Sequence, residues 1–280
     1  MAKPTLFVLI CGIVSTSLGL AYLKLSGAPA SYIFVNFGAL LFGLLISGVR
    51  FVPVFRERAS VPEFWILTFA IILALTALFG TNVEGIKRWL TIGPIQFQPG
   101  LLFVPLMTLL FARSSTPLAG LGICIAALSL AMQPDRATAG ALCAALLGLL
   151  VFRRDQVTLI CAAFAMVGFC VTLVRTDGLG AVEFVEGIYQ AAILSGGAEL
   201  LIVALGTTLL FAPVSVSRIA PITHAPIYFT FAVLWLSLVV AAYVGPYPTP
   251  LLGNGTSSIL GYLLCVFGFP APGNKERAGA

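Results

Sequence analysis

The 280 residues are 60% hydrophobic and 9% charged, with a mean hydropathy of +1.08. This composition leaves too little polar surface for a water-soluble fold and indicates an integral membrane protein. Several apolar runs approach the roughly 20 residues that a helix needs to cross a hydrocarbon core of about 30 Å, and none shows the ten-residue alternation of a membrane barrel. The expected fold class is therefore all-α: a polytopic, membrane-spanning helical bundle.

Charges and prolines divide the chain into about ten candidate spans, which we expect to form a single transmembrane domain over residues 1–280. The fourth, fifth and sixth are short for full crossings, so they are expected to recruit flanking residues or to lie deep in the bundle. The first span is expected to stay uncleaved, because its apolar run exceeds the usual core of a signal peptide. The spans are expected near 5–23, 32–49, 64–80, 99–112, 117–132, 138–152, 156–174, 190–212, 225–244 and 255–271.

The distribution of basic residues sets the expected orientation. With a cytoplasmic N-terminus, ten Lys and Arg residues fall inside and five outside. Because positive residues are retained on the cytoplasmic side, this split places both termini in the cytoplasm. The net charge of +5 is then mostly a topological bias and requires no nucleic-acid partner. The outside residues are Lys24, Lys87, Arg88, Arg136 and Arg175.

The stretch 80–99 is polar and rich in Gly and Pro, although most of the chain is apolar. It carries Glu84, Lys87, Arg88 and Trp89 on the expected outer face. A cationic, rigid loop at the membrane surface suits an anionic lipid headgroup, since Arg and Lys bind phosphate. The alternative is a plain interfacial anchor, because Trp and basic residues also favour the headgroup zone.

Two further polar positions and the cysteines deserve separate interpretations. Glu199 lies within the eighth expected span, where acids usually face a bundle interior or a cavity and are functional candidates; it could instead be protonated, or lie close enough to the outer surface to reach water. His224 fits a cytoplasmic helix start, because the chain has one His and no second one to complete a metal site. All six cysteines fall inside expected spans and fit small packing residues.

Four outer-face motifs resemble a known family. Gly85-Ile-Lys-Arg-Trp-Leu-Thr-Ile-Gly93, followed by Gln98-Pro99, resembles the Gly-Ala-Arg-Arg-Trp, Gly and Gln-Pro-Ser-Glu signature of the SEDS family (shape, elongation, division and sporulation; the RodA/FtsW group). Residues 133–138 are similar to its Gln-Pro-Asp-x-Gly-Thr, residues 250–258 to its Pro-Phe-x-Ser-Tyr-Gly-Gly-Ser-Ser, and residues 192–197 to its Ala-Ile-Gly-Ser-Gly-Gly. The motifs also occur in the family's order.

The resemblance implies a glycosyltransferase of the inner (cytoplasmic) membrane that polymerises a lipid-linked peptidoglycan precursor on the outer face, in cell elongation or division. It also implies a transpeptidase or another cell-wall or division membrane protein as partner. Asp135 and Arg136 have an alternative role, in which they pair and cap the sixth span. Substrate-binding roles are implied for Lys87, Arg88, Trp89, Gln98, Asp135, Arg136, Asn254, Ser257 and Ser258.

The chain departs from the family pattern at its catalytic motif. Gly100 and Leu101 replace the Ser-Glu after Gln-Pro, and the Thr-Asp-Phe-Ile-Phe motif, whose aspartate is the family's expected base, is not found. If residues 185–189 take the place of that motif, Glu186 replaces the aspartate. If residues 192–197 are the true anchor, most of the loop is deleted and the base is missing.

Glycosyl transfer from a lipid pyrophosphate needs a carboxylate to deprotonate the attacking hydroxyl, and cations or a metal to stabilise the leaving group. Glu186 and Asp177 are the candidate bases, although either could be a solvated loop acid. The sequence does not decide whether basic side chains or a divalent cation stabilise the pyrophosphate leaving group. No set of metal ligands is assigned. The alternatives to a polymerase are a catalytically degenerate lipid-binding or scaffold protein and, through Glu199, a transporter of the lipid-linked precursor.

Overall fold

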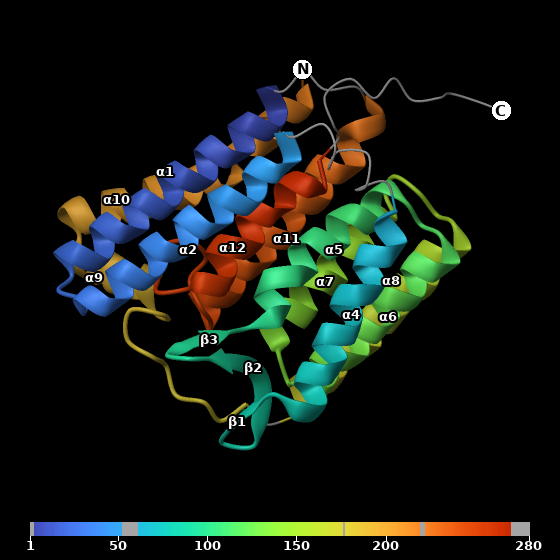
Figure 1. The fold of residues 1–280 in the computed structure, drawn as a ribbon, viewed down its shortest axis with the longest axis horizontal. Helices are drawn as coiled ribbons and strands as arrows, with labels where there is room; N and C mark the ends of the chain where they lie inside the picture. Colours follow the sequence, from blue (N-terminus) through green and yellow to red (C-terminus); the bar gives the residue numbers. More distant parts are fainter. Residues whose placement is uncertain (1–2, 52–60, 176, 219–221, 270–280) are drawn as a thin grey trace.

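The structure is a computed structural model that describes residues 3–51, 61–175, 177–218 and 222–269. It is a bundle of roughly aligned helices with a small β-sheet at one end, as Figure 1 shows. The protein is a polytopic helical membrane protein, as the composition predicted. The helices are α1 (Lys3–Leu25), α2 (Ala30–Gly48), η1 (Val49–Phe51), α4 (Pro62–Phe79), α5 (Pro99–Arg113), α6 (Pro117–Met132), α7 (Arg136–Leu149), α8 (Gln156–Val174), α9 (Ile188–Ser195), α10 (Gly197–Phe211), η2 (Ala212–Arg218), η3 (Ile222–His224), α11 (Ala225–Val244), α12 (Thr256–Leu264) and η4 (Cys265–Phe267).

Within the described residues, six helical segments are long and apolar enough to cross a membrane. Helices α5, α6, α7 and α12 are shorter. Of these, α5, α7 and α12 are largely buried inside the bundle, whereas α6 exposes Leu118, Leu121 and Leu128. The total of ten spans stays a prediction. The six long segments are Thr5–Leu25, Ala30–Phe51, Pro62–Phe79, Gln156–Val174, Gly197–Val216 and Ala225–Val244.

The eighth expected span, 190–212, is not one continuous helix, so the sequence expectation was wrong here. The chain breaks between α9 and α10, where Gly196 and Gly197 have φ angles of 66° and 54°. Glycine adopts positive φ without the steric cost that a Cβ imposes, and it therefore ends one helix and redirects the next. The break moves the polar residues that follow it to the end of a helix.

Small residues allow the central helices to pack closely. A Cβ added at Gly261 of α12 would lie 2.2 Å from the carbonyl oxygen of Leu101 in α5. Helix α7 is rich in alanine and buries most of its length. Close backbone approach of this kind replaces the hydrophobic driving force that is weak between helices surrounded by lipid tails. The central packing thus fixes where α5, α7 and α12 begin at the sheet end of the bundle.

The stretch 80–99 folds into an antiparallel sheet, which the sequence analysis did not predict. Strands β1 (Thr81–Val83), β2 (Ile86–Ile92) and β3 (Ile95–Phe97) lie in the order β1-β2-β3. Glu84 and Gly85, both with positive φ, form the two-residue turn between β1 and β2, the geometry that matches the natural twist of a hairpin. The sheet leads directly into α5.

Candidate functional site

Strand β2 separates the basic residues of its motif. Successive side chains of a strand point to opposite faces, so the neighbouring Lys87 and Arg88 diverge. Lys87 is the more exposed of the two and donates a hydrogen bond to the Leu78 carbonyl at the end of α4, across 2.9 Å. Arg88 is buried and pairs with Asp177 at 2.7 Å; its guanidinium also lies 5.1 Å from the ring centroid of Trp89.

Gln98 joins three separate parts of the chain. Its side-chain amide donates to Oδ2 of Asp135 across 2.8 Å, and its backbone N–H donates to Oγ of Ser257 across 2.7 Å. Asp135 also accepts a hydrogen bond from the Thr138 backbone at 3.2 Å and caps α7. Three residues predicted from separate motifs therefore lie in contact, at the starts of α5, α7 and α12.

Asp135 and Arg136 do not pair in the part of the chain that the structure describes. Asp135 acts as the cap that one sequence interpretation expected, while Arg136 donates to the backbone carbonyls of Thr172, at 2.8 Å, and Arg175. Arg175 in turn donates to the carbonyls of residues 131 and 132. These arginines tie the end of α8 to the α6–α7 connection, and they leave phosphate binding by Arg136 untested.

The loop before α12 is held by hydrogen bonds to its backbone N–H and carbonyl groups. The N–H of Asn254 donates to the Phe184 carbonyl at 2.7 Å, and Oγ of Ser258 donates to the Gly255 carbonyl at 2.9 Å. Asn36, buried in α2, donates to the Gly253 carbonyl at 2.9 Å and accepts from the Gly255 N–H at 3.2 Å. We did not single out Asn36 from the sequence, although a lone amide in an apolar span was a usable signal.

Glu186 is the candidate base that the structure leaves free of an ion pair among the described residues. Its carboxylate accepts a hydrogen bond from the Val182 N–H at 3.0 Å. Burial raises the pKa of the Glu186 carboxyl above its usual value; the Val182 hydrogen bond and the charge of Arg88 lower that pKa, and the charge of Asp177 raises it. Glu186 therefore lies within electrostatic reach of the Arg88–Asp177 pair.

A polar cavity of about 260 Å³ lies beside Glu186. Glu183 and Glu199 line it together with Tyr22 and Ser26, and Oγ of Ser26 donates to Glu199 at 3.4 Å. Glu199 was expected within a continuous span, but the helix break places it in the first turn of α10. A carboxylate in the first turn interacts favourably with the N-terminal end of the helix dipole. Glu199 is therefore not a charge buried in the middle of a membrane span.

Tyr247 interacts electrostatically both with Asp177, the partner of Arg88, and with Asp135, the partner of Gln98. Sequence reasoning missed this tyrosine. Burial raises the pKa of its hydroxyl above the usual value; the charges of Asp177 and Asp135 raise that pKa, while Arg136 lowers it by charge and by hydrogen bonding. The sequence signal was a tyrosine between prolines in an outer loop. Tyr247 thus lies within electrostatic range of both the Asp177 side and the Asp135 side.

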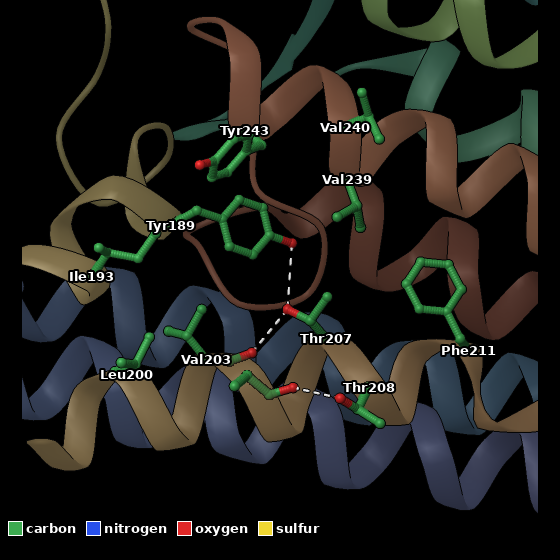
Figure 2. A pocket seen from close by; sticks show the side chains of 11 residues that line it. Tyr189, Ile193, Leu200, Val203, Thr207, Thr208, Phe211, Val239, Val240 and Tyr243 are labelled. Carbon is green, nitrogen blue, oxygen red and sulfur yellow. Dashed lines mark hydrogen bonds between the residues drawn. The ribbon is translucent and has the colours of Figure 1, made fainter. Parts of the chain in front are cut away.

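A second, apolar groove of about 520 Å³ lies between α9, α10 and α11, and Figure 2 shows it. Tyr189 and Tyr243 lie at its α9 side, and the Tyr189 hydroxyl is 3.5 Å from Oγ1 of Thr207. Across the described ranges, no cluster of three or more His, Cys, Asp or Glu side chains has the arrangement of a metal site.

The fold and this cluster define a class: an integral membrane helical bundle whose polar side chains gather at one end, beneath a short sheet. The sequence model of the FtsW, RodA and SpoVE cell cycle protein family matches residues 3–190. The chain belongs to this family, the SEDS proteins.

Solved structures have the same fold. The rod shape determining protein RodA of Thermus thermophilus is 18% identical, with a TM-score of 0.67 and coverage of 93% of each chain. A variant of that RodA is 19% identical, with the same TM-score and coverage of 93% of this chain and 94% of the other. A chain from a structure of a peptidoglycan synthase complex that coordinates polymerization and crosslinking is 18% identical, with a TM-score of 0.64 and coverage of 93% and 96%. No curated protein sequence matches significantly.

Proposed function

We propose that this protein is a peptidoglycan glycosyltransferase of the inner membrane, which polymerises a lipid-linked disaccharide on the outer face and uses Glu186 as general base. A sugar hydroxyl of one precursor attacks the anomeric carbon of another. Glu186 takes the hydroxyl proton, a new glycosidic bond forms, and the bond to the lipid pyrophosphate breaks, leaving the pyrophosphate with the bonding electrons.

The observation that carries this proposal is the environment of Glu186. It is a half-buried carboxylate beside a polar cavity, with its pKa raised by burial and with a cation in range. A general base works best when its pKa lies near the operating pH, and partial burial moves a glutamate in that direction. Its rival Asp177 is already paired with Arg88 and is poorly placed to accept a substrate proton.

The pyrophosphate leaving group must be stabilised by positive charge. Arg88 is the candidate, because its charge acts on Glu186. Its fork geometry suits bidentate contact with phosphate. The described residues do not provide a cluster that fits a divalent cation, so we derive no step through a metal. Gln98, Asp135 and Ser257 support the site indirectly, because their hydrogen bonds hold the helix starts together.

The test is polymerisation of a fluorescent lipid-linked disaccharide by the purified full chain, with and without a candidate transpeptidase. Glu186→Gln should preserve folding and lipid binding and lower polymerisation by about 10²-fold or more, the usual scale for loss of a general base. Glu183→Gln, an exposed acid of the same loop, should have a much smaller effect. Absence of glycan chains from the wild type under both conditions would sink the polymerase proposal.

A catalytically degenerate lipid-binding or scaffold protein is the second candidate. It is favoured by the observation that the basic side chains of the site already have partners within the protein. Asp177 neutralises Arg88, and Lys87 and Arg136 donate to backbone carbonyls. Lipid binding and partner-dependent localisation without turnover would support this candidate. The transporter hypothesis rested on Glu199 in mid-span, and we do not pursue it, because Glu199 lies at the start of α10.

The proposed partner is a transpeptidase. One structure with the same fold comes from a complex described as coordinating polymerization and crosslinking. A chain that makes uncrosslinked glycan needs an enzyme that consumes it, and a membrane-anchored transpeptidase would keep the two reactions together.

A further inference from the structure

Arg88 is a buried cation whose hydrogen-bonding capacity is only partly used. Its side chain is 6% exposed, and within the described residues its Nε has no hydrogen-bond partner. A guanidinium has five N–H donors, and burying it without partners is costly. The site therefore holds unused capacity for an anion with more acceptor oxygens than one carboxylate offers.

The carboxylate that pairs with Arg88 comes from a weakly anchored loop. Residues 177–182 have neither helix nor strand, and their described polar anchors are the Asp177–Arg88 ion pair and, at the far end, the hydrogen bonds of Val182 with Val185 and Glu186. A Cβ added at Gly178 or Gly180 would meet nothing within 4 Å. The segment is thus packed loosely between firm attachments at its two ends.

Those attachments are hydrogen bonds that do not involve the ion pair. At one end, the guanidinium of Arg175 donates to the carbonyls of residues 131 and 132. At the other end, the N–H groups of Thr249 and Asn254 donate to the carbonyls of Val185 and Phe184. If the ion pair opens, the segment between can swing outward while Glu186 and its neighbours stay in place.

We propose that Asp177 is a displaceable latch, which occupies Arg88 in the resting protein and gives way to the pyrophosphate of a lipid-linked ligand. A pyrophosphate brings more negative charge and more acceptor oxygens than a carboxylate, and bidentate Arg–phosphate contacts are strong. It therefore satisfies Arg88 better than Asp177 does. The identity of the ligand as substrate rests on the proposed function; the latch itself rests on the ion pair and the loop.

Opening of the latch can be measured without any turnover. The full chain carrying Leu179→Cys, a half-buried position of the same segment, in nanodiscs, is treated with a membrane-impermeant maleimide, and the same protein without the new cysteine gives the background. We expect undecaprenyl pyrophosphate to raise the labelling rate several-fold, and undecaprenol to leave it unchanged. Acceleration by inorganic pyrophosphate alone would show that the headgroup suffices, and it supports the latch as well.

Variants separate the latch from general loosening of the loop. Asp177→Asn should label several-fold faster without ligand, whereas Glu84→Gln, which removes one outer acid at the tip of the β1–β2 hairpin, should label at the parent rate. Because a buried unpaired Arg88 can destabilise the fold, the double variant Arg88→Gln, Asp177→Asn removes both charges. It should label fast and show no response to the lipid.

Equal labelling of the parent with and without undecaprenyl pyrophosphate would overturn the latch, as would a lipid response that persists in the double variant. Polymerisation is measured on the same samples, where Asp177→Asn should lower KM several-fold. If labelling depends on the lipid but no glycan forms, the polymerase proposal is refuted and the latch proposal stands. If glycan forms but labelling does not depend on the lipid, the latch proposal is refuted and the polymerase proposal stands.

Discussion

The side-chain amide of Gln98 donates a hydrogen bond to Oδ2 of Asp135, and this buried 2.8 Å contact joins the end of the sheet to the start of α7. The other carboxylate oxygen of Asp135 caps α7 through the Thr138 N–H. One aspartate therefore serves two partners that are far apart in sequence. Through this aspartate, the Gln-Pro motif at Gln98 and the Gln-Pro-Asp motif at Asp135 are joined by a hydrogen bond.

Asp135→Ala is expected to destabilise the protein by about 2 kcal/mol or more, because it removes a helix cap and leaves a buried amide donor without a partner. Thermal unfolding in detergent measures this. Asp155→Ala is the comparison, since Asp155 caps α8 through the Thr158 N–H and its further contacts, with the Thr158 hydroxyl and with Arg153, are partly exposed. It should cost only about 1 kcal/mol. Equal losses would mean that the buried contact with Gln98 contributes no more than these partly exposed contacts.

The acidic limb of the pH profile for kcat/KM should lie above the pKa of an ordinary glutamate. A general base acts when deprotonated, and the Glu186 pKa is raised, so activity should be present above that pKa and lost as the pH falls through it. Arg88→Gln removes a charge that lowers the Glu186 pKa and should move the limb to higher pH. Asp177→Asn removes a charge that raises it and should move the limb to lower pH.

These opposite shifts identify Glu186 more specifically than loss of activity does. Glu84→Gln is again the control, because Glu84 lies in the exposed hairpin turn and has no described contact with Glu186. A limb that stays in place in both the Arg88 and Asp177 variants would assign it to another group. Profiles are measured with the lipid-linked disaccharide below its KM, where the free enzyme determines the pKa values.

Gly261→Ala should destabilise the bundle by about 1–3 kcal/mol, the usual range for overpacking a close contact. The added methyl group would lie 2.2 Å from the Leu101 carbonyl oxygen, so α5 and α12 must move apart. Gly38→Ala in α2 is the control, because a Cβ there meets nothing within 4 Å and should be neutral or slightly stabilising. Thermal unfolding of both variants in the same detergent decides the result.

Single-cysteine labelling should place positions 87 and 183 outside the cell and position 153 in the cytoplasm. The positive-inside rule predicts this orientation. Strand β2, which carries Lys87, and the loop 177–187, which carries Glu183, lie at the sheet end, whereas the connection after α7, which carries Arg153, lies at the opposite end. Arg56, Arg58, Lys275 and Arg277, which contribute to the predicted cytoplasmic excess, lie outside the described residues. Labelling of position 87 from the cytoplasmic side alone would reverse the working face.

The sequence by itself determined the class of protein and the regions where the site lies. Hydropathy specifies a helical membrane bundle, because a backbone in lipid must satisfy its hydrogen bonds within the helix. Turn and charge patterns located the polar segments, and the motif order indicated the family. These features are local in the chain, so they can be read without knowing which segments meet.

Only the tertiary structure decided which side chains face one another. Lys87 and Arg88 are neighbours in sequence but diverge because they lie on a strand, and the sheet itself was hidden in a stretch expected to be a loop. The break at Gly196 moved Glu199 to a helix start. The pairing of Arg88 with Asp177, across 89 positions, has no sequence signal, since it depends on how loops from distant helices pack at one end of the bundle.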